Sequence, residues 1–276
     1  MNIENLLRPY NKEHSIKEVI FTLFFTLPIE DYSSLKENLQ KRFSKQDFEE
    51  PENISVIKYK INSENPTTIQ SDNAVRVGLL WQKKNKDTSS IKQSFQIRNL
   101  EEQSFISFHE LSYKRWVNFK EDFLNILSDI CSENIVDNFI VAGLNLTYID
   151  EFEWIGDSNL DLNQIFKNDS SYLPKYFFNS HYPSVDIAAL INEDESTEFL
   201  SERIAIDIQK TLPNSTIVIT HTVASTLEDP QNLDAFFREK IDFYLEKTHE
   251  FNKKTLDNLL TLDVQSLIHL PKNDSI

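Results

Sequence analysis

The segment from Ser104 to Trp154 changes its hydrophobic period twice, and this change constrains the fold more than any other feature. It reads as a strand with a period of two, then a helix with a period near 3.6, then a second strand. The apolar face of the helix consists of Trp116, Phe119, Phe123, Leu127, Ile130 and Cys131. A helix with one apolar face has to cover a sheet, so the segment predicts a strand–helix–strand unit.

The residues before this segment predict the rest of a first sheet. Ile16 to Leu27 is continuously apolar and aromatic, as expected of a buried strand, and Asp31 can cap the helix that follows it. Three short strands joined by polar turns come next, at Val75–Gln82, Ser94–Leu100 and Ser104–Leu111. Polar turns of this length favour an antiparallel meander.

The C-terminal part repeats this pattern in outline. Residues 157–183 are irregular, and a second meander follows at Val185–Ile191, Phe199–Thr211 and Thr216–Ser225. Asp229 and Pro230 read as the cap and first residue of one long helix that runs to about Phe251. The predicted fold class is therefore α+β, with two antiparallel sheets covered by helices and a long C-terminal helix. The predicted division is an N-terminal half at 1–156, a connector at 157–183 and a C-terminal half at 184–276.

One glycine lies inside a predicted strand. Gly143 interrupts the alternation of the strand from Asn138 to Ile149. A glycine in the middle of a strand marks a bulge or a close approach of another backbone.

Composition and charge narrow the class of protein. The net charge is −16, from 44 acidic and 28 basic residues, which opposes direct binding to nucleic acid or to an anionic membrane. The longest apolar run, Val19 to Leu27, is too short to span a bilayer, and the N-terminus lacks a secretory pattern. Cys131 is the single cysteine, so an internal disulfide is excluded. These features predict a cytoplasmic protein.

Familiar catalytic motifs are missing from the sequence. The three glycines are too far apart for a phosphate-binding loop, and no GxSxG motif is present. The six histidines are scattered, with no pair spaced to share one face of a helix or strand. We therefore predict no cofactor, no metal and no catalytic residue, and Cys131 is interpreted as an inert core thiol.

Two sets of residues remain as candidate sites. The densest acidic run could contact a basic partner protein, and its residues are Glu193, Asp194, Glu195 and Glu198. A cleft between the sheets would be lined by aromatic and histidine side chains of the strands, namely Trp81, His109, Tyr148 and His221. Trp116 is a further lining candidate, although its place on the helix indicates the core.

Several short motifs resemble a sporadically distributed bacterial protein family of unknown function. They are the segment IKEVIFTLFF after Pro9, then YKRWVNF, IVAGLNLTYID, IFKNDSSYLP, ERIAIDIQ and LEKTHEFNKKTLDNLL. Asn145 departs from the family, which carries a basic residue at that position. The resemblance implies an α+β fold without assigned catalysis, and the family's patchy occurrence implies a role in defence or conflict systems.

Three functions follow as hypotheses. The first is a binding protein without catalytic activity that acts through a protein partner, as a sensor, inhibitor or accessory subunit of a bacterial antiviral defence or toxin-type system. Its partner would be a basic or nucleic-acid-binding protein. The second is a nuclease-like, metal-dependent enzyme whose site is assembled from distant residues. The third is a small-molecule-binding module that uses the aromatic cleft.

Overall fold

The structure is a computed structural model of the chain. It describes residues 3–11, 14–57, 59–61, 69–71, 74–132, 139–155, 159–180, 183–191, 199–210 and 214–270. The predicted acidic run at 193–198 lies outside the described residues.

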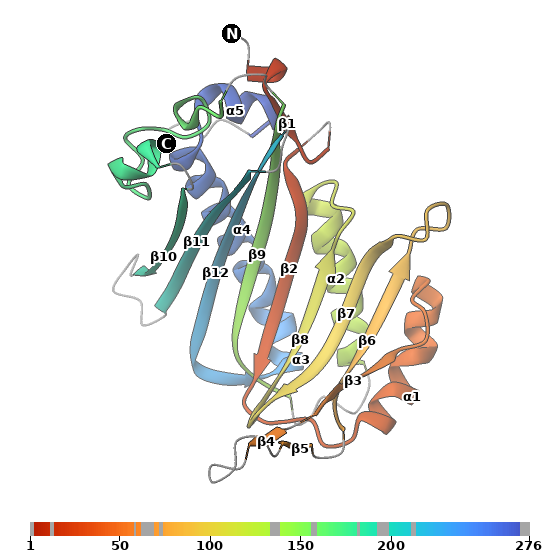
Figure 1. Ribbon diagram of the computed structural model, residues 1–276. Coiled ribbons are helices and arrows are strands. Elements are labelled where there is room, and N and C mark those ends of the chain that lie inside the picture. The colour runs from red at the N-terminus through yellow and green to blue at the C-terminus, as the bar shows by residue number, and fades with distance from the viewer. Residues whose placement is uncertain are drawn as a thin grey trace.

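A ten-stranded antiparallel sheet dominates the fold (Figure 1). Nine of its strands follow the order β10-β11-β12-β9-β2-β8-β7-β6-β3, and β1 pairs with β9. The bounds are β1 Leu7–Pro9, β2 Ile16–Phe25, β3 Glu52–Val56, β6 Val75–Lys84, β7 Ile91–Leu100, β8 Gln103–Glu110, β9 Ile140–Trp154, β10 Ser184–Ile191, β11 Phe199–Lys210 and β12 Ser215–Asn232. A separate pair joins β4 (Tyr59–Ile61) to β5 (Ile69–Ser71).

The α+β class and the antiparallel meanders are confirmed, but the prediction of two sheets is wrong. Strands β2 and β9 pair antiparallel along their length, for example at Phe21 with Leu146, and they join the two meanders edge to edge. Val19, Phe21, Leu23 and Phe25 of β2 are buried, and a strand in the middle of the fold needs hydrogen-bond partners along both edges of its backbone. One continuous sheet meets this need. The division into two domains stays a prediction.

The helices gather on one face of the sheet. Figure 1 shows α2 and α4 behind the strands. The α-helices are α1 Tyr32–Phe43, α2 Trp116–Cys131, α3 Leu233–Glu239, α4 Ile241–Leu259 and α5 Leu262–Leu267. Short 3₁₀ turns lie at Ile3–Asn5, Ser44–Gln46, Leu162–Gln164 and Lys175–Asn179. The predicted cap of α1 is confirmed, because Asp31 accepts hydrogen bonds from the backbone of Ser33 and Ser34.

The predicted helix from Pro230 to Phe251 is not confirmed as one element. Asp229 and Pro230 still belong to β12, and the helix cap is Asn232, whose side chain accepts from the Asp234 backbone. Lys240 then separates α3 from α4. An aspartate before a proline signals a helix start only when the backbone is free to turn. Here the backbone just after Pro230 pairs with β9, at Gln231 and Asn232, so the helix cannot start at that point.

The helices and the sheet enclose two large apolar clusters. The first lies under α1, α2, α3 and the start of α4, with Phe21 and Tyr244 among its members. The second lies at the other end of α4, around Phe152 and Leu259. Between Leu245 and Leu256, the buried residues of α4 are polar apart from Phe251, and the polar ones are Thr248, His249, Asn252 and Thr255. We refer to these four residues and the strand side chains that they meet as the polar seam.

The prediction that Gly143 marks a close backbone approach is confirmed. A Cβ atom at Gly143 would lie 2.7 Å from the carbonyl oxygen of Ser225 on β12. The register between β2 and β9 also shifts here, between Phe24 and Phe25. Only glycine lets the β12 backbone come this near.

Substitution of Gly143 by alanine is expected to destabilise the protein. The added methyl group meets a backbone atom that cannot rotate away, so we expect a loss of about 1–3 kcal/mol in the free energy of unfolding. Urea denaturation of the variant measures this loss, and Ser94→Ala on β7 serves as a control at a half-buried strand position. An unchanged denaturation midpoint for Gly143→Ala would show that β12 can move away from β9 without a loss of stability.

Among the described helices, none is both long enough and apolar enough to cross a membrane. Cys131 packs partly against the first apolar cluster, and burial raises the pKa of its thiol to about 12. A thiol with this pKa stays protonated at neutral pH, which agrees with the predicted inert role.

Candidate functional site

A cavity of about 540 Å³ opens where α4, the start of α2 and the ends of β2 and β9 meet. Its volume lies within the range of pockets that hold small organic molecules. The floor is formed by buried residues, among them Ser15, Tyr113, Tyr148, Asp150 and His249. The mouth is formed by more exposed ones, among them Lys114, Arg115, Lys253 and His269.

Strand alternation places Tyr148 and Asp150 in the floor. On β9 the even-numbered residues from Leu144 to Trp154 face the helices, and Tyr148 and Asp150 fall in this phase. Asp150 has no exposed surface. A carboxyl group at a position otherwise filled by apolar side chains is costly to bury unless hydrogen bonds or an opposite charge compensate it.

Asp150 has one satisfied and one unsatisfied oxygen. Oδ1 accepts a hydrogen bond from the Ser15 hydroxyl at 2.6 Å, whereas Oδ2 accepts none from the described residues. Burial raises the pKa of Asp150 to about 6, and the Ser15 hydrogen bond limits the rise. At neutral pH the group is therefore mainly a buried carboxylate with one open acceptor.

Tyr148 and His249 form a hydrogen-bonded pair beside Asp150. The Tyr148 hydroxyl lies 2.7 Å from Nδ1 of His249. Burial, followed by the charges of its neighbours, raises the pKa of Tyr148 far above its usual value, so the hydroxyl stays protonated and donates a hydrogen bond to Nδ1. Burial lowers the pKa of His249 to about 3, so the imidazole is neutral and carries its proton on Nε2.

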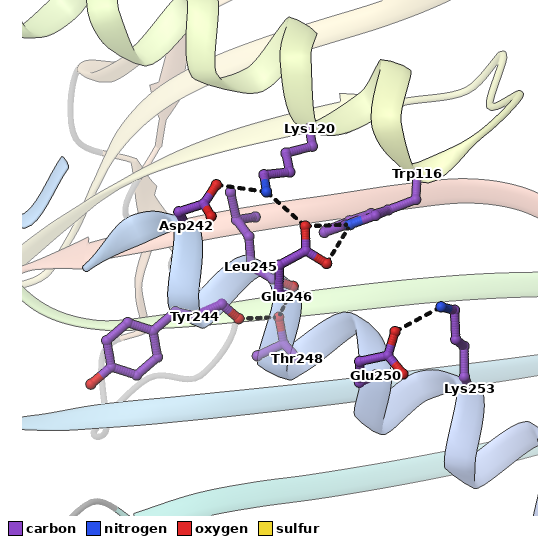
Figure 2. A network of polar contacts seen from close by, with 9 residues as sticks. All are labelled: Trp116, Lys120, Asp242, Tyr244, Leu245, Glu246, Thr248, Glu250 and Lys253. Atoms are coloured by element: carbon purple, nitrogen blue, oxygen red, sulfur yellow. Dashed lines mark hydrogen bonds and ion pairs between the residues drawn. The ribbon is translucent and has the colours of Figure 1, made fainter. Parts of the chain in front are cut away.

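Trp116 forms the wall above His249. The two rings stack with centroids 4.2 Å apart and planes 12° apart. Figure 2 shows the anchor of this stack: Glu246 on α4 accepts from the Trp116 indole nitrogen at 3.1 Å and from Lys120 at 2.6 Å. The contact ties α2 to α4 and fixes one side of the cavity.

A second cluster of hydrogen-bonded side chains extends the polar seam behind the cavity. Asn252 lines the cavity and its amide lies 2.9 Å from Nδ1 of His221. Nε2 of His221 lies 2.8 Å from Glu202, which also accepts from Thr255 at 2.6 Å. Burial alone would raise the pKa of Glu202, but the hydrogen bonds from His221 and Thr255 outweigh burial and lower it. These side chains satisfy one another's hydrogen bonds, so the role of the cluster is structural.

The structure brings together two of the four predicted cleft residues. Tyr148 lines the cavity, and His221 contacts the lining residue Asn252. Trp81 lies in the first apolar cluster, where its indole donates to Gln40. His109 lies on the opposite face of the sheet, because it alternates with Phe108, which packs beneath α2.

Ser107, His109 and Glu18 are arranged like the nucleophile, base and acid of a catalytic triad. Its Nε2 lies 3.0 Å from the Ser107 hydroxyl, and its Nδ1 lies 2.7 Å from Glu18. Ser107 is only 2% exposed and also accepts a hydrogen bond from Thr22. Strands β2 and β8 are each paired on both sides, so their backbone N–H groups are engaged and offer no oxyanion hole. The arrangement therefore holds the face of the sheet together.

Metal chemistry gains no support from the described part of the chain. There, no three side chains of histidine, cysteine, aspartate or glutamate gather closely enough to hold an ion. On the exposed face of the sheet, the carboxylate of Asp186 on β10 accepts a hydrogen bond from Arg203 at 2.6 Å.

Sequence reasoning missed Asp150 and His249. Asp150 could have been found from its position on β9, because strand alternation places it on the same buried face as Leu144, Leu146 and Tyr148. The signal for His249 is that it lies four residues after Leu245 and seven before Leu256, on the same buried face of α4. In both cases a polar residue occupies a core position.

Comparisons with known proteins add little to these findings. No protein-family model and no curated protein matches the chain, which is consistent with a family of unknown function. Two solved structures align at 8% identity and a TM-score of 0.18. They are the di-domain ARO/CYC StfQ from the steffimycin biosynthetic pathway, with 91% of this chain and 97% of that chain covered, and the di-domain ARO/CYC BexL from the BE-7585A biosynthetic pathway, with 94% and 100% covered. Likeness at this level supports no inference about function.

Proposed function

We propose that this protein binds a small organic molecule in the cavity between α4 and the sheet. The observation that carries the proposal is Oδ2 of Asp150, a buried acceptor with no hydrogen-bond partner among the described residues, in the lining of a cavity large enough for a ligand. A core built only for stability would fill this volume with apolar side chains. A bound molecule would satisfy the carboxylate and occupy the space.

The partner-binding role inferred from charge stays a prediction, because its acidic run lies outside the described residues. The cavity favours the small-molecule hypothesis, since its lining combines aromatic side chains with a few buried polar ones, among them Asp150 and His249. Tyr113, Tyr148 and Trp116 supply the aromatic surface. This combination of apolar walls and a few directed polar groups is typical of ligand pockets.

Thermal unfolding in the presence of a low-molecular-mass extract from the source organism tests the proposal. A ligand present well above its Kd stabilises the folded state, so we expect the wild-type Tm to rise by about 5 °C. Lys253→Trp places a bulky ring at the mouth and is expected to abolish the rise. Native mass spectrometry then gives the mass of the bound molecule.

Lys254→Trp is the matched control. Lys254 is the next residue on the same helix, but it is exposed and directed away from the cavity, toward Phe251. This variant should keep the full rise in Tm. A wild-type Tm that the extract leaves unchanged, or a rise that persists in Lys253→Trp, would overturn the proposal.

A further inference from the structure

We infer that the ligand is a small zwitterion of the amino-acid type, with a protonated amine against Asp150 and a carboxylate at the basic mouth of the cavity. The inference rests on the proposed function and adds the chemical class of the ligand. It follows from three features of the cavity: the floor, the aromatic walls and the mouth.

The floor calls for a positively charged donor. Asp150 is fully buried, its Oδ2 has no hydrogen-bond partner among the described residues, and no described lysine or arginine forms an ion pair with it. A buried carboxylate without a counter-charge is costly, and an ammonium group supplies both the hydrogen bond and the missing charge.

The aromatic walls suit the same group. The rings of Tyr113 and Tyr148 lie edge to face with centroids 6.4 Å apart, and both tyrosines are close enough to Asp150 for its charge to raise their pKa. The Tyr113 hydroxyl has no hydrogen bond to another described residue. Aromatic rings grouped around a carboxylate are a recurrent setting for organic ammonium ions.

The mouth calls for a negative group. Lys114 and Arg115 are exposed there, and Arg115 is the residue that precedes the first turn of α2. Lys253 on α4 also lines the mouth, although it forms an ion pair with Glu250 at 2.7 Å. These cations stand together on a chain whose net charge is −16. The free N–H groups at the start of α2 add to the positive potential. A simple amine would be repelled at this mouth, and a simple acid would be repelled by the floor, so a molecule with both groups fits best.

Isothermal titration of the full chain with α-amino acids, ω-amino acids and dipeptides tests the inference. We expect at least one of these probes to bind. Its N-acetyl derivative, which lacks the positive charge, should bind at least about thirty-fold more weakly, as expected when one partner of a buried charge pair is removed. The matching amine without a carboxylate should bind about five-fold more weakly, since the mouth is exposed to solvent.

Two variants assign these effects to the two ends of the cavity. Asp150→Asn should weaken binding as much as N-acetylation does, whereas Asp186→Asn, an exposed carboxyl on the other face of the sheet, should not. The pair Lys114→Gln and Arg115→Gln changes only exposed side chains and should reproduce the loss of the ligand carboxylate. This double variant keeps the test valid if Asp150→Asn does not fold.

The outcomes separate this inference from the proposed function. If no probe binds while the cell extract still raises the Tm, the cavity binds a ligand and the zwitterion assignment is wrong. Binding that survives both N-acetylation and Asp150→Asn would also overturn the assignment.

Discussion

Acidification is expected to destabilise the folded protein through His249. An unfolded histidine takes up a proton near pH 6.5, but in the folded protein burial lowers the pKa of His249 to about 3. The unfolded state therefore binds more protons between these two values, and stability is lost as the pH falls through this window. The shift corresponds to about 5 kcal/mol over the whole window, of which about 2–3 kcal/mol is lost by pH 4.5.

Urea denaturation of the wild type and of His249→Asn at about pH 7 and about pH 4.5 measures this effect. Asparagine keeps an acceptor for the Tyr148 hydroxyl but cannot take a proton in this range. The variant should lose about 2–3 kcal/mol less than the wild type on acidification. His269→Asn, at an exposed position by the mouth, should behave as the wild type does. Equal losses in wild type and His249→Asn would show that the imidazole is already protonated when folded.

The sequence predicts much of this fold, because its strands and helices have strong periods. The stripe from Trp116 to Ile130 appears as predicted, and the predicted alternation appears from Ile140 to Ile149 with a change of phase at Gly143. The pairing of β2 with β9 could not be predicted, since these strands are more than a hundred residues apart and their apolar runs allow several partners. The extension of β12 through Pro230 could not be predicted for the same reason, because it depends on pairing with the distant strand β9.

The candidate site was harder to predict than the fold. Tyr148 was identified because an aromatic strand residue is a natural lining group, but Trp81 and His109 met the same criterion and lie elsewhere. The site depends on residues from four segments, including Ser15, Tyr113, Asp150 and His249. No short motif joins them, and only the tertiary structure brings them within contact.

Asp150 is expected to reduce the stability of the unliganded protein at neutral pH. An unfolded aspartate loses its proton near pH 3.8, whereas in the folded protein burial raises the pKa of Asp150 to about 6. The folded state binds more protons in this window, so stability falls as the pH rises through it. Above about pH 6 the full cost, about 3 kcal/mol, is present.

The groups around Asp150 do not remove this cost. Ser15 donates one hydrogen bond from the start of β2, and Tyr113 and Tyr148 stay protonated and neutral. His249 on α4 is neutral at the same pH. A ligand that brings a positive charge would offset this cost, so the destabilising effect of Asp150 is coupled to binding. Ligand binding should accordingly strengthen as the pH rises through about 6, since the carboxylate is the binding form.

The free energy of unfolding of Asp150→Asn, compared with that of the wild type at about pH 4 and about pH 7.5, tests the central claim most directly. Asparagine has nearly the same shape but no charge, and both proteins carry His249, so the difference between them isolates the carboxyl group. We predict that the variant gains about 2–3 kcal/mol relative to the wild type between the two pH values, while it loses the ligand. A stability difference that does not change with pH, together with intact ligand binding, would contradict the role of Asp150 as a buried charge kept for a ligand.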